Sequence, residues 1–451
     1  IGIAAIGATM VILTGGIDLS VGSVMGLTVV VAALLFERGA GVPGAVAGSV
    51  ASLLFFVTSE TIPASIGVQR IATATQSFPL LAVPLFVLAG NLMNASGITD
   101  RIISLARALT GWLTGGLAQV SIVVSTLMGG VSGSAVADAA MEARILGPSM
   151  LKQGYSRGYS AAVIAVSSLI CATIPPSIGL ILYGFLGNVS IGKLFLGGVV
   201  PGLLMTFVLM GTAWLIARKR GYRPDLAAFP GWREVGREAN RSKWALLFPV
   251  FLVIGIRFGV FTPSEVGAFA VAYAIAVGTL AYRELDWAKF NAALRHSVHD
   301  IGMIMLIIMF SAMIGYVIAL ERVPQNAAEA IVGFTQNRDA LLVMLVVFIL
   351  LLGMFLESTV IVLLLTPILV PTVVKAGIDP VHFGLVMMTA TTLGSMTPPV
   401  GVAMYTVCGM LGTPMDEYVR EALPLIAAVV VLIFAMAFVP QIVLFLPELL
   451  M

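Results

Sequence analysis

Two pairs of adjacent prolines stand inside long apolar segments of this chain, Pro175-Pro176 in the first half and Pro398-Pro399 in the second. Proline has no backbone N–H, so inside a helix it leaves the carbonyl four residues earlier without its usual donor. A bare carbonyl in apolar surroundings is costly unless another group or a cation satisfies it. The carbonyls at these positions belong to Cys171, Ala172, Gly394 and Ser395. The two breaks therefore predict oxygen-lined sites that suit a hard cation such as Na⁺.

Hydroxyl side chains beside each break strengthen this prediction, because they add oxygen ligands. They are Thr173, Ser177, Ser395 and Thr397. For a single proline pair, the alternative is a plain kink that neighbouring helices satisfy. The same pair stands at equivalent places in both halves, which favours the ion site.

A second feature precedes each break and could face a substrate. Residues 129–138 read GGVSGSAVAD, a small and polar stretch between apolar flanks that suits the tip of a re-entrant hairpin. The counterpart in the second half contains Glu357 and Thr359. Backbone N–H groups at the start of half-helices attract anions. We therefore assign four residues to candidate substrate contacts: Ser134, Asp138, Ser177 and Thr359.

Two carboxylic acids, Asp138 and Glu357, lie within or next to apolar runs. Ionisable residues inside a membrane are costly and point to function by default. Either could bind a cation, carry a proton or hold structure. Asp138 could equally be a charge at a helix N-terminus or at the membrane edge.

Constellations typical of soluble enzymes are missing from the sequence: there is no Walker loop, no HExxH, no CxxC and no nucleophile elbow. Cys171 and Cys408 stand in apolar segments and fit small buried residues better than a disulfide or a metal site. We predict that the chain is not an enzyme. An intramembrane enzyme is a third alternative, for which only Asp138 and Glu357 could supply a catalytic pair.

The elements that must position these residues are membrane helices. Hydrophobic residues make up 59% of the 451 residues and charged residues 10%, and the mean hydropathy is +1.06. A soluble domain has roughly 45–50% apolar and about 25% charged residues. Charge-free runs such as 303–320 and 340–356 approach the roughly 20 residues that a membrane helix needs. The composition predicts an all-α polytopic membrane protein.

The two halves of the chain resemble each other at an offset of 223 positions. The residues that coincide are Pro148 with Pro371, Lys152 with Lys375, Gly154 with Gly377, the two proline pairs, and Pro201 with Pro424. Internal repeats are typical of secondary transporters, whose sites lie at the repeat interface. The offset alone does not show whether the second copy is inverted.

One hydrophilic stretch, 218–243, stands between the halves. It holds eight basic and three acidic residues beside two apolar segments. An excess of lysine and arginine next to membrane helices marks the cytoplasmic side. We predict a cytoplasmic loop here, and no nucleic-acid partner.

These motifs resemble, in their order along the chain, the large membrane subunit of tripartite ATP-independent periplasmic (TRAP) transporters, the DctM family. The resemblance runs from about residue 41 to the end. The motifs that carry it are SFPLLAVPLFVLAG (77–90), SGSAVAD (132–138), IPPS (174–177), FTPSE (261–265), GMFLE (353–357), DPVHFG (379–384) and TPPVG (397–401).

The resemblance implies a fold and a set of partners. It implies two repeats, the second inverted, with re-entrant hairpins and broken helices, and a scaffold domain beside an elevator-type transport domain. It implies a bacterial inner-membrane importer coupled to Na⁺, assembled with a small four-helix membrane subunit and fed by a periplasmic substrate-binding protein. The substrates of the family are mostly small organic anions, such as C4-dicarboxylates and sugar acids.

The family also implies which residues hold Na⁺, mostly through backbone carbonyls. In the first half these are Ser132, Cys171, Ile174 and Pro176. In the second half they are Glu357, Ser395 and Thr397. Where many relatives have an Asp-Pro pair, this chain has Glu357-Ser358, which puts that ligand set in question.

The beginning of the chain departs from this family. Residues 1–37, which contain VILTGGIDLSVGS (11–23), resemble a fragment of ribose-type ABC sugar permeases. An ABC-type permease driven by a separate ATPase is accordingly the alternative function, although one more membrane helix is the simplest role for the segment. The chain starts at Ile1 rather than Met, as expected of a truncated chain or a piece of a longer reading frame.

We divide the chain accordingly. Residues 1–40 form an atypical N-terminal membrane segment, and 41–217 form the first half, with a hairpin and a broken helix. Residues 218–243 form the basic loop, and 244–451 form the second half, with its own hairpin and broken helix.

Overall fold

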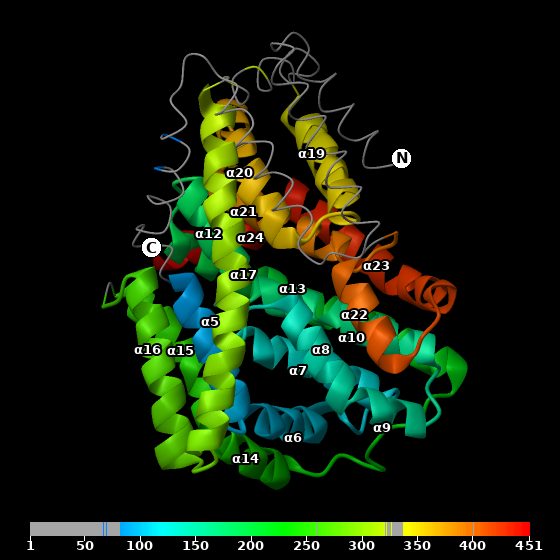
Figure 1. Ribbon diagram of the computed structural model, residues 1–451. Coiled ribbons are helices and arrows are strands. Elements are labelled where there is room, and N and C mark those ends of the chain that lie inside the picture. The colour runs from blue at the N-terminus through cyan, green and yellow to red at the C-terminus, as the bar shows by residue number, and fades with distance from the viewer. Residues whose placement is uncertain are drawn as a thin grey trace.

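The computed structural model describes Ile66, Gln69, 82–258, 260–320, Arg322, Asn326, 337–399 and 401–451. Over these ranges the chain is helical and contains no β-strand (Figure 1). This confirms the predicted all-α class. The segment 1–40 and residues 77–81 of the first motif lie outside the described residues, as does Val400 in the last motif.

The first half contains a pair of angled helices, a hairpin, a broken helix and a long closing helix. In chain order they are α5 (Ala82–Ala95), α6 (Ile98–Thr110), α7 (Gly116–Gly129), α8 (Ala135–Ile145), α9 (Gly147–Lys152), α10 (Arg157–Ser167), α11 (Leu169–Thr173), α12 (Ile178–Leu186) and α13 (Ile191–Arg220).

The second half repeats this order after three further helices and a π-helical turn. Its elements are α15 (Lys243–Arg257), α16 (Pro263–Ala276), η2 (Val277–Ala281), α17 (Trp287–Leu320), α19 (Arg338–Gly353), α20 (Ser358–Lys375), α21 (Pro380–Gly394), α22 (Val402–Leu411), α23 (Met415–Phe438) and α24 (Gln441–Leu450).

The repeat seen in the sequence is also a repeat of elements. Helices α8 and α20, and likewise α10 and α21, begin at positions separated by the same 223 residues. Gly154 and Gly377, which coincide at this offset, both have a left-handed backbone, with φ of 85° and 71°. The hairpins α7–α8 and α19–α20 lie toward opposite ends of the molecule (Figure 1). That placement is the one that inverted copies require.

Several helices are long and apolar enough to cross a membrane. Among the described residues these are α13, α20 and α23. Two bent pairs of helices also qualify if each counts as one span, α5 with α6 at 69° and α10–α11 with α12 at 45°. The length and composition of these helices are therefore consistent with the predicted multi-pass membrane protein.

The basic stretch 218–243 differs from the predicted loop. Helix α13 extends into it as far as Arg220, and a further helix, α14 (Trp232–Arg241), lies within it. Helix α14 is strongly amphipathic: Val235 and Glu238 are buried while Arg233 and Arg237 are exposed. It packs against α6. A prediction from hydropathy misses this helix, because most of its residues are charged or polar and only a few are apolar.

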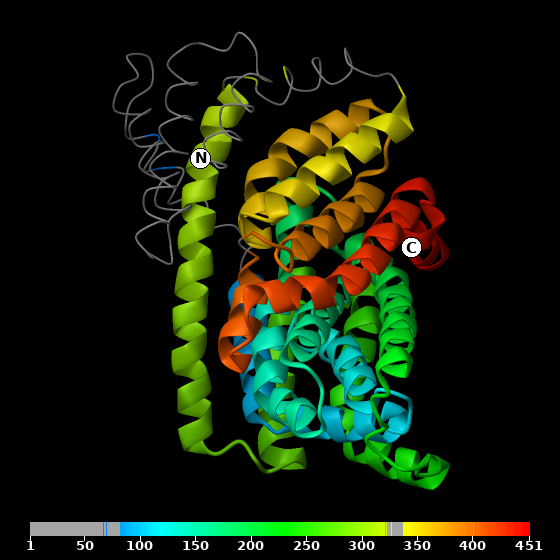
Figure 2. The same ribbon diagram turned by 90° about the vertical axis from the view of Figure 1, so that its right-hand side faces the viewer.

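The two halves interlock rather than stand side by side. Helix α10 of the first half packs on α23 of the second, and α12 packs on α20. Arg220 at the end of α13 forms an ion pair with Glu421 of α23. Helix α17 runs along one side of the molecule, where it contacts α5 and α20 (Figure 2). The hairpins and broken helices of both halves therefore share one packed core.

Candidate ion and substrate site

The tip of the first hairpin lies directly against the first proline break. Helix α7 ends at Gly129, and the tip continues to Ser134, which caps α8 by accepting a hydrogen bond from the N–H of Ala137. Gly133 has φ of 65°, and a Cβ there would stand 2.2 Å from the carbonyl oxygen of Pro176. Only glycine allows this approach, which holds the tip at the break.

The predicted first-half ligands converge at this contact. The Ser132 hydroxyl lies 3.0 Å from the Cys171 sulfur, and a Cβ on Gly129 would meet the Ile174 Cβ at 2.9 Å. The structure therefore brings together all four residues of the predicted first-half ion site, Ser132, Cys171, Ile174 and Pro176. Helix α5 also reaches this place, since Gly90 packs on the backbone of Ser132.

The first break lies at the proline pair, as the sequence predicts. Helix α11 ends at Thr173, and Ser177 caps the next helix, α12, by accepting from the N–H of Leu180 at 3.4 Å. The groups four residues after Cys171 and Ala172 are Pro175 and Pro176, which donate nothing. The Thr173 hydroxyl donates to the carbonyl of Leu169 within its own helix. Its contribution to an ion site is therefore limited to the oxygen lone pairs that remain.

The second break corrects part of the prediction. The Gly394 carbonyl accepts from both the N–H and the hydroxyl of Thr397, at 3.0 and 2.7 Å. The Ser395 carbonyl accepts from the N–H of Ala403 at 3.1 Å. These two carbonyls are therefore not bare, because Thr397 just before the prolines and Ala403 beyond them supply the donors. A carbonyl oxygen has two lone pairs, so Ser395 keeps one for a ligand.

The second hairpin tip contacts the second break through glycine. A Cβ on Gly353 would stand 2.8 Å from the Cα of Gly394, and the Met354 carbonyl accepts from the N–H of Gly401 at 3.2 Å. The tip–break contact of the first half is thus present again. The predicted residues Ser395 and Thr397 lie at this contact.

Glu357 occupies the position equivalent to Ser134, and like Ser134 it caps the N-terminus of the helix that follows. Its carboxylate caps α20 by accepting from the N–H groups of Thr359 and Val360, at 2.8 and 3.4 Å. It also accepts from the hydroxyls of Ser358 and Thr359, both at 3.0 Å. The Thr359 hydroxyl is therefore already bonded to Glu357. The side chain of Glu357 is positioned by four donors at the tip, where the resemblance placed an ion ligand.

Asp138 lies in the first turn of α8, near a helix N-terminus as one of the alternatives held, and it is buried rather than exposed. Its side chain is buried, with 1% of the residue exposed, and neither carboxylate oxygen has a hydrogen-bond partner. The neighbouring acid Glu142, one turn further along α8, is also buried. Sequence reasoning missed Glu142, although its spacing of four residues from Asp138 places both acids on one helix face.

Comparison with known proteins gives the family. The protein-family model described as "Tripartite ATP-independent periplasmic transporter, DctM component" matches residues 28–442 of this chain. The sialic acid TRAP transporter large permease protein SiaM of Vibrio cholerae is 37% identical over 410 residues, 91% of this chain and 96% of that protein. The 2,3-diketo-L-gulonate TRAP transporter large permease protein YiaN of Escherichia coli is 34% identical, covering 87% of this chain and 92% of that protein.

A third relative is longer than this chain. The isethionate TRAP transporter permease protein DctMQ of Oleidesulfovibrio alaskensis is 34% identical over 405 residues, which is 90% of this chain and 64% of that protein. Among solved structures, the YdaH transporter of Alcanivorax borkumensis matches with a TM-score of 0.54 at 14% identity, covering 81% of this chain and 86% of that one. This likeness supports the fold alone.

The family match begins at residue 28, inside the segment whose sequence resembles an ABC permease fragment. It continues through both hairpins and both broken helices, which weakens the alternative of an ABC-type permease. The relatives cited above are named as transporter permeases, which supports the prediction that the chain is no enzyme. By the extent of the family match and the identity to curated large permeases, the chain belongs to the DctM family of TRAP transporter large membrane subunits.

Proposed function

We propose that the chain is the large permease subunit of a Na⁺-coupled, binding-protein-dependent importer of a small organic anion. The observation that carries this proposal is the paired contact of hairpin tip and proline break in each half. Tip and break pack through glycine at Gly133 in the first half and at Gly353 in the second. Broken helices at repeat interfaces hold coupling ions in secondary transporters.

In this proposal each half binds one Na⁺ between its tip and its break. The first ion is held by Ser132, Cys171, Ile174 and Pro176, and the second by Glu357, Ser395 and Thr397. A hard cation suits these oxygen ligands, and in the first half it satisfies carbonyls that the prolines leave without donors.

The substrate binds beside these ions, near the helix N-termini. Ser134, Ser177 and Glu357 cap the N-termini of α8, α12 and α20, and a helix N-terminus carries a partial positive charge that attracts anions. The relatives are named for sialic acid, 2,3-diketo-L-gulonate, isethionate and C4-dicarboxylate, which are all organic anions. We extend this chemical class to the present chain, with Ser134, Ser177 and Thr359 as substrate contacts. Asp138, the fourth residue predicted as a contact, is buried one turn below the tip and is not among them.

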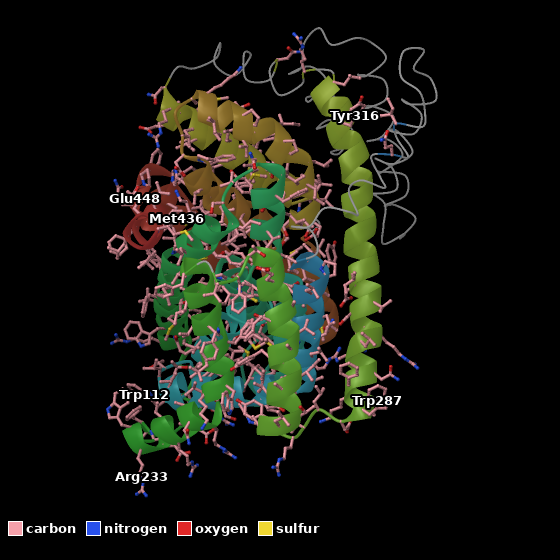
Figure 3. The ribbon with its side chains drawn as sticks, turned by 90° about the vertical axis from the view of Figure 1, so that its left-hand side faces the viewer. Trp112, Arg233, Trp287, Tyr316, Met436 and Glu448 are labelled. Carbon is pink, nitrogen blue, oxygen red and sulfur yellow. The ribbon has the colours of Figure 1, made fainter. Side chains whose placement is uncertain are left out.

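Transport proceeds by an elevator movement of the two hairpins and broken helices against a scaffold. The scaffold associates in the bacterial inner membrane with a small TRAP membrane subunit, and a periplasmic binding protein delivers the substrate. The end that carries α14 faces the cytoplasm: Arg233 lies there with Trp112 and Trp287 (Figure 3). Basic residues favour the cytoplasmic side, and tryptophans gather at membrane interfaces.

The test is uptake into proteoliposomes that contain the chain and its small subunit. The binding protein is added outside with radiolabelled N-acetylneuraminate, succinate or isethionate, under an inward Na⁺ gradient and without ATP. We expect uptake of one of these anions that requires both the gradient and the binding protein. Uptake that instead requires ATP and a separate ATPase would overturn the proposal in favour of the ABC-type alternative.

A further inference from the structure

A second polar cluster lies inside the first hairpin, about one to two helical turns below its tip. It is formed by two acids of α8, Asp138 and Glu142, and by serines on the facing helices: Ser121 and Ser125 of α7, and Ser167 of α10. All five residues are buried, with at most 1% of each exposed. The predicted Na⁺ site at Ser132 does not include any of them.

Hydrogen bonds order one of the two acids. Ser125 donates to Glu142 at 2.7 Å, and Ser121 donates to the other oxygen of the same carboxylate. Ser167 lies 3.2 Å from the Ser125 hydroxyl and 3.4 Å from that of Ser121. Two serines of α7 therefore donate to the Glu142 carboxylate of α8, and Ser167 of α10 lies against both serines.

The other acid has no such partners. Both carboxylate oxygens of Asp138 lack a hydrogen bond, although Ser125 lies beside it and donates to Glu142 instead. None of the ion pairs among the described residues includes Asp138 or Glu142. A buried carboxylate needs a hydrogen-bonded or charged partner, and two like charges at such close range repel each other. The cluster thus has a deficit of positive charge.

We infer that Asp138 and Glu142, with the hydroxyls of Ser121, Ser125 and Ser167, bind a further Na⁺ inside the first hairpin. The ligands are all oxygen atoms, four from carboxylates and three from hydroxyls, as a hard cation prefers. No group of three or more His, Cys, Asp or Glu side chains occurs among the described residues, so the cluster does not fit a transition-metal site. The inference rests on the proposed Na⁺ coupling and adds an ion to it.

The position of the site suggests its role. Asp138 is one turn from Ser134, the residue that caps α8 at the hairpin tip. An ion held by α7, α8 and α10 joins the hairpin to the broken helix, because α10 leads into the first break. Its binding stabilises the tip against the break and so favours binding at the tip itself.

The test is equilibrium binding of radiolabelled Na⁺ to the chain, purified with its small subunit in lipid nanodiscs. The double variant Asp138→Asn/Glu142→Gln keeps the size of both side chains and removes their charge. We expect it to lose one bound Na⁺ per chain relative to the unmodified protein. Glu448→Gln, an exposed carboxylate near the C-terminus (Figure 3), is the matched control and should bind as the unmodified protein does.

The outcomes separate this inference from the proposed function. If the unmodified protein binds no Na⁺, the coupling itself is wrong. If it binds Na⁺ and the double variant binds the same number with the same affinity, the coupling stands and the further site is refuted, since protons then neutralise the acids. Should the double variant fail to fold, Ser121→Ala and Ser125→Ala provide the test. Each should weaken one Na⁺ site by about tenfold or more, and unchanged binding in both would refute the site.

Discussion

At the scale of single residues, the backbone of the hairpin tip is as important as its side chains. Gly133 combines a left-handed backbone with a contact to the Pro176 carbonyl that leaves no room for a Cβ. Gly154 has a similar backbone, with φ of 85°, but nothing lies within 4 Å of the place where its Cβ would stand. Substitution of Gly154 therefore tests backbone strain alone, whereas substitution of Gly133 tests backbone strain together with loss of the tip–break contact.

This difference gives a matched prediction. Gly154→Ala should cost the roughly 1–2 kcal/mol of a left-handed L-residue and leave function intact. Gly133→Ala should cost more and should abolish the stabilisation by Na⁺, because the tip must withdraw from Pro176. Thermal unfolding in the presence and absence of Na⁺ measures both effects. Equal Na⁺ stabilisation in the two variants would show that the tip–break contact does not form the ion site.

Residue types also explain how much of the site could be predicted from the sequence. The proline pairs, the glycine-rich tip and the offset of 223 positions were visible because proline and glycine restrict the backbone wherever they occur. The donor to the Ser395 carbonyl was not, since the N–H of Ala403 reaches it only through the path of the turn beyond the prolines. The pairing of Glu142 with serines of α7 likewise depends on helix packing, which no local pattern reports.

At the scale of elements, one buried tyrosine connects α23 to the second break. The Tyr418 hydroxyl donates to the Met396 carbonyl at 2.8 Å, and Met396 lies between Ser395 and Thr397. Tyr159 makes the same kind of bond far from both breaks, to the Ala213 carbonyl at 3.2 Å. Both side chains are fully buried.

Removing each hydroxyl should therefore have the same structural cost and different functional results. We expect Tyr418→Phe and Tyr159→Phe each to lower the free energy of unfolding by about 0.5–1.5 kcal/mol, the net contribution of one hydrogen bond. Only Tyr418→Phe should change the Na⁺ concentration that gives half-maximal uptake. A similar change in Tyr159→Phe would mean that general destabilisation, rather than the second break, sets the ion affinity.

Elements were predicted unevenly. Both hairpins and both broken helices were expected from the apolar runs and their interruptions, and they occur at the expected positions. Helix α14 was not expected, because a short amphipathic helix rich in arginine has the composition of a loop. The division of the chain at residues 217 and 244 remains a prediction, as do the separate scaffold and transport domains.

At the scale of the whole molecule, the opposite placement of the two hairpins makes a topological prediction. Arg233 in α14 and Asp339 at the start of α19 are both exposed, and they should face opposite sides of the membrane. The native Cys171 and Cys408 are buried, so labelling by a thiol reagent is expected to come from a cysteine introduced at the surface. A membrane-impermeant thiol reagent on intact cells should label the Asp339→Cys variant and spare the Arg233→Cys variant.

Opening the cells should then expose the Arg233→Cys variant to the same reagent. Labelling of both variants in intact cells would contradict both the cytoplasmic placement of the basic stretch and the inverted relation of the halves. Either result requires an exposed position, and both residues are exposed.

The N-caps of α8 and α20 differ in charge. At equivalent positions one hairpin tip presents the hydroxyl of Ser134 and the other presents the carboxylate of Glu357. In the proposed function, an ion at the second tip meets a carboxylate in the cap itself, whereas the cap of the first tip is uncharged and the nearest acid, Asp138, lies one turn along α8. The repeat is therefore similar in shape and different in charge at its two tips. For the proposed organic anion, we expect the acid group to lie nearer the uncharged cap of the first tip than the carboxylate of Glu357.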